Sequence, residues 1–121
     1  MGAEGTHPSL LLEELVNDRA GSGLGSLSHV LAYSHDRDEV FLVEVKSHLR
    51  EEGLQQMLRI LREFHEFFPG HEGKKVYGIL AVVDVPDEVR DRVLREGIYL
   101  ARIHDNLFEI QTPEGFQPRA F

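Results

Sequence analysis

Hydrophobic and polar positions follow two different periods along this chain, and those periods predict its elements. Within residues 51–68, apolar side chains recur every three or four positions, which indicates a helix that ends at Pro69 and Gly70. Residues 40–43 and 76–83 are instead continuous apolar runs, typical of strands that are covered on both faces. The pattern therefore predicts a protein that combines amphipathic helices with buried strands.

Shorter segments complete the predicted order of elements. Apolar residues spaced three and four apart predict a first helix over residues 8–20. Residues 27–47 contain two apolar segments joined by a polar turn, which predicts a β-hairpin. A proline and acidic residues at the start predict a helix over residues 86–96, and two further strands are expected within residues 98–111.

This order predicts the fold class. The second strand of the hairpin and the strand at 76–83 are expected to be parallel, with the helix at 51–68 as a right-handed crossover between them. We therefore expect an α/β protein with a mixed central sheet flanked by helices. A length of 121 residues corresponds to a single domain.

Composition and charge narrow the class of protein. The sequence is 41% hydrophobic and 28% charged, as in ordinary soluble domains, and contains no cysteine, which excludes disulfides and thiolate metal sites. It has neither a signal-peptide pattern nor an apolar run approaching the roughly 20 residues that span a membrane, so we expect a cytoplasmic protein without membrane contact. The net charge of −8 disfavours polyanions in bulk, although a local basic patch would still attract one.

Within residues 40–46 of the strand at 39–47, every residue is apolar except the charged Glu44 and Lys46. Alternate residues of a strand share a face, so both side chains are expected on the same side of the sheet. Charges in such a strand are costly unless they are paired or used. One interpretation is a metal-dependent phosphodiester site, with Glu44 and the Val45 carbonyl as ligands and Lys46 orienting water. The other interpretation is an ion pair at the edge of the sheet.

An ordered set of short motifs accompanies this strand. The motifs occupy residues 43–47, 64–69, 74–78, 96–99 and 113–119. With the order of helix, hairpin, Glu-x-Lys, helix and strand, the chain resembles the PD-(D/E)XK nuclease superfamily. More narrowly, it resembles an uncharacterised bacterial family of nuclease-like proteins of the DUF3782 type. The resemblance covers about residues 26–121. It implies a restriction-endonuclease-like αβββαβ core, a divalent metal such as Mg²⁺ or Mn²⁺, and nucleic acid as partner.

The same resemblance shows a missing acid. The family places an acidic residue on the strand before Glu44, whereas no acid occurs between Asp18 and Asp36 here. Matching the apolar residues that follow puts His29 in that position, with Ser28 as the alternative. A neutral imidazole suits Mn²⁺, Zn²⁺ or Fe²⁺ better than Mg²⁺. His29 therefore indicates a degenerate site, a site suited to a softer metal, or a surface histidine without a role.

The resemblance also implies two further candidate site residues. Related nucleases place a glutamate of the first helix near the metal, and here Glu14 or its neighbour Glu13 would occupy that place. They also place a glutamine at the start of the helix after the lysine strand, which corresponds to Gln55 or its neighbour Gln56. An ordinary solvated surface position is the alternative for each of these residues.

Two functions remain open at the level of sequence. The first is a metal-dependent nuclease that uses Glu44, Val45, Lys46 and His29. The second is a catalytically inactive nuclease-fold module that serves in binding or assembly. In that case the strands of residues 98–111 are expected to pair with a second copy as a homodimer.

Overall fold

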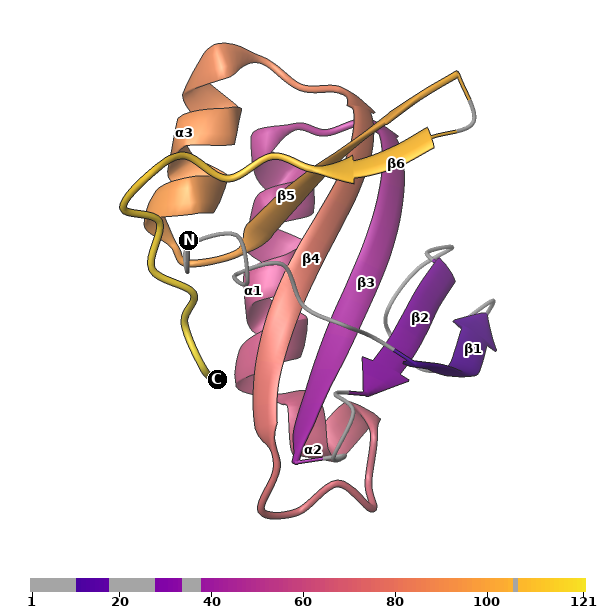
Figure 1. The fold of residues 1–121 in the computed structure, drawn as a ribbon. Helices are drawn as coiled ribbons and strands as arrows, with labels where there is room; N and C mark the ends of the chain where they lie inside the picture. Colours follow the sequence, from indigo (N-terminus) through magenta and orange to yellow (C-terminus); the bar gives the residue numbers. More distant parts are fainter. Residues whose placement is uncertain (1–10, 18–27, 34–37, 106) are drawn as a thin grey trace.

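The strands of the sheet lie in the same spatial order as they occur in the sequence (Figure 1). The computed structural model describes residues 11–17, 28–33, 38–105 and 107–121, with the backbone alone at 11–17, 28–33 and 108. Within these residues, the sheet has six strands. They are β1 (Leu11–Asn17), β2 (Ser28–Tyr33), β3 (Glu39–His48), β4 (Lys75–Asp84), β5 (Tyr99–His104) and β6 (Leu107–Ile110).

Helices connect the parallel strands. Helix α1 (Glu51–Arg62) and the short α2 (Phe64–Phe67) lie between β3 and β4, and α3 (Asp87–Arg95) lies between β4 and β5. Strands β3, β4 and β5 run parallel, whereas the pairs β1–β2, β2–β3 and β5–β6 are antiparallel. This mixed sheet with flanking helices confirms the predicted α/β fold class. None of the helices in the described part of the chain is long and apolar enough to cross a membrane.

The two faces of the sheet have separate hydrophobic clusters because side chains alternate along each strand. In β3, Val40 and Leu42 pack with α1 and α3 in the larger cluster. Phe41 and Val43 belong to the smaller cluster on the opposite face, where the Phe41 ring stacks on Tyr77 at 5.3 Å between centroids. The even-numbered positions of β3 therefore lie on the face that the helices cover. Figure 1 shows α1 behind the sheet in that arrangement.

The first helix predicted over residues 8–20 is wrong for residues 11–17, which form strand β1. The register of β1 against β2 shifts between Leu12 and Glu14, as in a β-bulge. The extra residue places positions 12 and 15 on the same side of the sheet, although an unbroken strand would place them on opposite sides. The spacing of three between apolar residues therefore results from a bulged strand, although it also matches the period of a helix. Residues 8–10 and 18–20 of the predicted helix lie outside the described residues.

The predicted helix over residues 51–68 is divided in two. Glu63 separates α1 from α2 with a non-helical backbone (φ −107°, ψ 29°). Beyond this break, the rings of Phe64 and Phe68 lie 5.0 Å apart and both are buried in the larger cluster. The break therefore directs the side chains of Phe64 and Phe68 into the hydrophobic core.

The last ten residues form an extended segment that is attached to the rest of the molecule at three points. The Phe116 ring packs against Tyr99 with 5.1 Å between centroids. The backbone N–H of Arg119 donates to the Gly97 carbonyl at 3.0 Å, and that of Phe121 donates to the Val76 carbonyl at 2.7 Å. The bond to Val76 satisfies a carbonyl near the start of β4, where β5 does not pair with this strand.

Candidate functional site

Strand β3 places a fully buried carboxylate beside a partly exposed ammonium. Glu44 has no exposed surface, whereas the Lys46 side chain is 25% exposed, and Nζ lies 3.7 Å from Glu44 Oε2. Both residues lie on the helix-covered face, in line with Val40 and Leu42. A buried carboxylate requires compensation by charge or hydrogen bonds, so its presence in an apolar strand points to a use.

Position 29 lies directly opposite Glu44. The antiparallel register of β2 and β3 pairs His29 with Glu44, and that of β1 and β2 pairs Val16 with His29. Residues directly opposite in an antiparallel pair share a face of the sheet, with Cβ atoms about 5 Å apart. The backbone therefore brings position 29, rather than position 28, to the face and row of Glu44. This is the position where the family resemblance expects an acid.

Glu14 lies farther from Glu44 in the sheet. It pairs with Leu31, which in turn pairs with Leu42, so Glu14 is two strands away and one row from Glu44. Strands are spaced about 4.8 Å apart, so the two backbone positions are separated by roughly 10 Å across the sheet. The glutamate that the sequence assigned to a first helix therefore occupies a position on an outer strand.

Val45 separates the two charged residues and faces the other way. Its side chain is 49% exposed on the face opposite the helices. The part of Val45 that the sequence predicts as a metal ligand is its backbone carbonyl. The role of that carbonyl stays a prediction.

The two glutamines of α1 lie on different sides of the helix. Gln55 is exposed and its Nε2 donates to Glu51 Oε2 at 2.8 Å, while Glu51 also pairs with Arg92 of α3 at 2.9 Å. Gln55 therefore lies on the side of α1 that is near α3. Gln56 follows Gly53 by three residues and shares its side of the helix, and Gly53 is the residue that adjoins Lys46. Residues three apart in a helix lie on the same side, so the spacing of three from Gly53 distinguishes Gln56 from Gln55.

The described side chains do not by themselves form a complete metal site. Among them, no group of three or more histidine, aspartate or glutamate residues is arranged to hold a metal ion. Glu44 and the Val45 carbonyl supply oxygen atoms, which Mg²⁺ and Mn²⁺ both accept. Position 29, opposite Glu44, is where the sequence predicts a further ligand, and an imidazole fits Mn²⁺ better than Mg²⁺.

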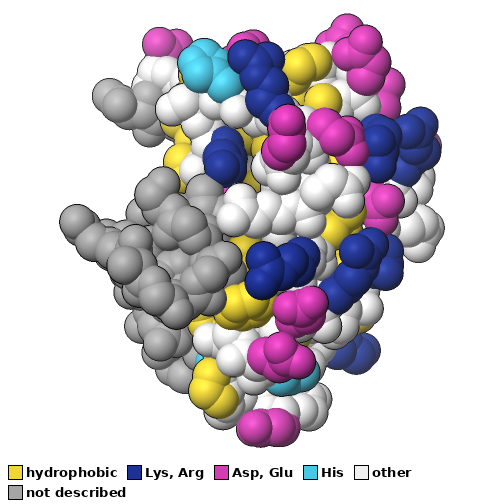
Figure 2. All heavy atoms as spheres, turned by 180° about the vertical axis from the view of Figure 1, so that it is seen from behind, with side chains coloured by type: hydrophobic (Ala, Val, Ile, Leu, Met, Phe, Trp, Pro, Cys, Tyr) yellow, Lys and Arg dark blue, Asp and Glu magenta, His cyan; other side chains and the backbone are white. Residues whose placement is uncertain are grey.

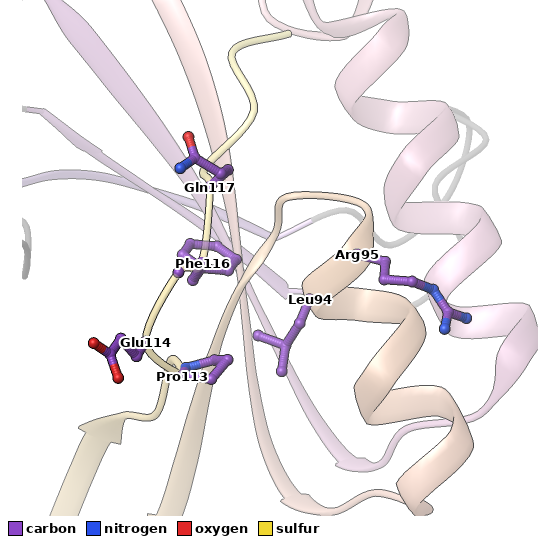
Figure 3. A pocket seen from close by; sticks show the side chains of 7 residues that line it. Leu94, Arg95, Pro113, Glu114, Phe116 and Gln117 are labelled. Atoms are coloured by element: carbon purple, nitrogen blue, oxygen red, sulfur yellow. The ribbon is translucent and has the colours of Figure 1, made fainter.

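Two cavities in the described part of the molecule lie elsewhere. They have volumes of about 340 and 390 Å³ and are situated between α3 and residues 111–117; Figure 3 shows the first of them. Leu94 and Pro113 line both of them, and Phe116 and Arg95 line the first. Neither is lined by Glu44 or Lys46, so the candidate site does not coincide with these hollows.

Charges of both signs are interspersed on the helix-covered face. Figure 2 shows Lys, Arg, Asp and Glu side chains alternating across this face rather than a single basic patch. Several arginines are paired locally, among them Arg92 with Glu51 at 2.9 Å and Arg59 with Glu63 at 3.7 Å. The described part of this face therefore does not carry the broad basic stripe typical of proteins that bind nucleic acid through phosphates alone.

Neither a protein-family model nor a curated protein matches this sequence, so the DUF3782 resemblance stays a prediction. Three solved structures are similar in fold. EndoMS in apo form is 16% identical with a TM-score of 0.60, over 93% of this chain and 42% of that chain. An EndoMS–dsDNA complex is 17% identical with a TM-score of 0.56, over 85% and 40%.

A repair endonuclease from Pyrococcus abyssi is 18% identical with a TM-score of 0.52, over 75% of this chain and 38% of that chain. The present chain thus spans about two-fifths of the length of each of these proteins. At these levels of identity, the similarity concerns the fold and not the activity. The mixed sheet and its flanking helices are those of an endonuclease-like fold.

Proposed function

We propose that this protein is a nuclease-like domain that hydrolyses phosphodiester bonds with a divalent metal ion. The observation that carries the proposal is the buried Glu44 carboxylate beside Lys46 on β3, with position 29 directly opposite. Its support from the comparisons is the endonuclease-like fold. A buried ionisable pair within a strand is unfavourable for stability alone, which favours a functional origin.

The residues of β3 have separate roles in this proposal. Glu44 and the Val45 carbonyl hold the metal ion together with His29, and Gln56 lies at the side of α1 that adjoins the site. A bound divalent ion supplies Lewis acidity and lowers the pKa of a coordinated water. Lys46 places an ammonium where negative charge develops on the phosphate, or orients the attacking water. The mixed oxygen and nitrogen donors favour Mn²⁺ over Mg²⁺.

Nucleic acid is the proposed substrate. One of the structures with a similar fold is a complex of EndoMS with double-stranded DNA. The net charge of −8 requires that binding rely on contacts close to the site rather than on a general electrostatic attraction. We therefore expect weak binding of nucleic acid in the absence of the metal ion.

Calorimetry with Mn²⁺ and Mg²⁺ tests the metal site. Wild-type protein is expected to bind Mn²⁺ more tightly than Mg²⁺, and Glu44→Ala is expected to lose both signals. Glu66→Ala removes an exposed carboxylate from α2 and serves as the matched control, with unchanged heats. Equal binding by the wild type and Glu44→Ala contradicts the proposed ligand.

Cleavage assays test the reaction. Plasmid or single-stranded substrate is incubated with Mn²⁺ and wild-type protein, and cleavage is expected to disappear in Lys46→Ala. His29→Asp restores the acid that the resemblance expects opposite Glu44, so it is expected to raise the affinity for Mg²⁺ and the rate with Mg²⁺. An unchanged Mg²⁺ affinity in His29→Asp contradicts the assignment of position 29.

A catalytically inactive module for binding or assembly is the second candidate, and the histidine at position 29 is the observation that favours it. Loss of an anionic ligand weakens a site for hard cations. This candidate predicts no metal-dependent heat and no cleavage in the wild type, together with retained binding of nucleic acid or formation of a homodimer. Sedimentation of the free protein and with DNA distinguishes it from the nuclease.

A further inference from the structure

Gly53 is a buried glycine in the first turn of α1, at the place where the helix adjoins the candidate site. Glycine is unfavourable inside a helix relative to alanine, because its backbone loses more freedom on folding. Gly53 is not among the glycines with a positive φ, so its conformational freedom is not what the position requires. The remaining reason for a glycine here is space.

The space beside Gly53 is filled by two side chains from the chain segment that precedes the helix. A Cβ atom at position 53 would lie 3.0 Å from Leu49 Cδ1 and 3.6 Å from Lys46 Cε. The first contact is tighter than ordinary packing, and the second is an ordinary van der Waals contact. The end of the Lys46 stem therefore passes directly over the backbone of α1 at Gly53.

This contact restricts a side chain that would otherwise have many conformations. A lysine loses considerable rotamer entropy when its ammonium is held in one place. Here the stem lies against α1 at Gly53 on one side, and the ammonium reaches Glu44 at 3.7 Å. We infer that Gly53 is a positioning residue: the absence of side-chain atoms beyond the Cβ position leaves room for the stem of Lys46 on its way to Glu44. The relevance of this contact to cleavage rests on the proposed function, whereas the positioning itself does not.

The reactivity of the Lys46 amine measures its position without any need for activity. The sequence contains three lysines, so trace acylation followed by mass spectrometry gives the labelling of Lys46 relative to exposed Lys75 in the same sample. The Lys46 amine is partly buried and held beside the Glu44 carboxylate, so the reagent reaches it less readily than the amine of exposed Lys75. We expect a labelling ratio of Lys46 to Lys75 below one in the wild type.

Three substitutions give a graded result. Gly53→Ala adds only a Cβ that Lys46 already tolerates at 3.6 Å, so the labelling ratio is expected to stay within about twofold, the scale of a small surface effect. Gly53→Val adds branched methyl groups in the path of the stem and is expected to raise the ratio about fivefold, as when a modest ion pair is lost. Gln55→Val is the matched control on the α3 side of the same helix, with an unchanged ratio.

The outcomes separate this inference from the proposed function. An unchanged ratio in folded Gly53→Val overturns the inference. If that variant does not fold, Gly53→Ser adds a single atom beyond Cβ, and an unchanged ratio in it is equally decisive. A raised ratio in Gly53→Val, together with slower cleavage than that of the wild type at an unchanged KM, supports both the positioning of Lys46 and the proposed function. A raised ratio while the wild type itself does not cleave supports the positioning of Lys46 and contradicts the nuclease.

Discussion

Removing the charges of Glu44 and Lys46 one at a time is expected to have different effects on stability. Lys46→Met keeps the length of the stem but leaves the Glu44 carboxylate buried without this ammonium. Breaking a fully buried pair in this way costs about 3–5 kcal/mol, and an exposed pair contributes below about 1 kcal/mol. Because Glu44 is fully buried and Lys46 is 25% exposed, we expect a loss of about 2 kcal/mol.

Glu44→Leu removes the buried charge itself and supplies an apolar side chain of similar size. Its register neighbour on β4 is Leu80, which belongs to the larger hydrophobic cluster. Replacing buried ionic groups by packed apolar ones is often neutral or stabilising, so we expect an unfolding free energy that is unchanged or higher by about 1–2 kcal/mol. The double variant is expected to resemble Glu44→Leu, because Lys46 then has no buried carboxylate to neutralise.

Thermal and urea unfolding at pH 7 measure these changes. For a chain of 121 residues, 1 kcal/mol corresponds to about 4 °C in Tm. Lys46→Met is therefore expected to lower Tm by about 8 °C, and Glu44→Leu to keep or raise it. If Glu44→Leu lowers Tm as much as Lys46→Met does, the carboxylate stabilises the fold, and the argument that it is kept for function is refuted.

Three further changes test the packing around the sheet. Gly78→Ala is expected to cost about 2 kcal/mol in urea unfolding, because its Cβ would lie 2.7 Å from Leu61 Cδ1; a loss below about 0.5 kcal/mol would contradict this close approach. Gly97→Ala combines a φ of +79° with a Cβ only 2.5 Å from Arg119 Cβ, so faster proteolysis of the C-terminal segment is expected, and unchanged proteolysis argues against its attachment there. Burial raises the pKa of Tyr99 above 10, so the folded state keeps its proton where the unfolded state loses it. Stability from this group is complete below pH 10 and falls at higher pH, and Tyr99→Phe is expected to reduce the fall in Tm between pH 9 and pH 11.

The central strands followed from the sequence because their apolar runs are long and bounded by polar turns. The segment at 76–83 corresponds to β4 (Lys75–Asp84), and the parallel pairing with β3 agrees with the expected crossover through α1. Both strands are covered on both faces, which is the condition under which a continuous apolar run is expected. Burial on both faces therefore produces a continuous apolar run, which can be recognised in the sequence without knowledge of the tertiary contacts.

The prediction of a first helix was wrong for a physical reason that the pattern of a single sequence does not contain. A bulge between Leu12 and Glu14 adds one residue to β1, and this changes the spacing of apolar positions from two to three. The period then agrees with a helix although the backbone is extended. Pairing with β2 decides the outcome, and β2 lies at a distance in the sequence.

The candidate site was partly accessible from the sequence. Alternation along β3 placed Glu44 and Lys46 on one face, and the structure brings them to 3.7 Å. The choice between Gln55 and Gln56 was not accessible, because it depends on which side of α1 faces α3 and which faces Lys46. The contact of Gly53 with Lys46 was likewise invisible, since a glycine carries no pattern of its own.

The identical order of the strands in space and in sequence has a consequence for how this domain can be elaborated. Its two outermost strands, β1 and β6, are also the first and last strands within the described residues. Additional segments joined at either end can extend the sheet outward without being threaded between strands that already pair. The interior strand β3, which holds the charged pair, and its neighbour β4 would be undisturbed by such growth. An architecture of this kind suits a unit that serves as one part of larger proteins, in which new modules accumulate at the margins while the centre is retained.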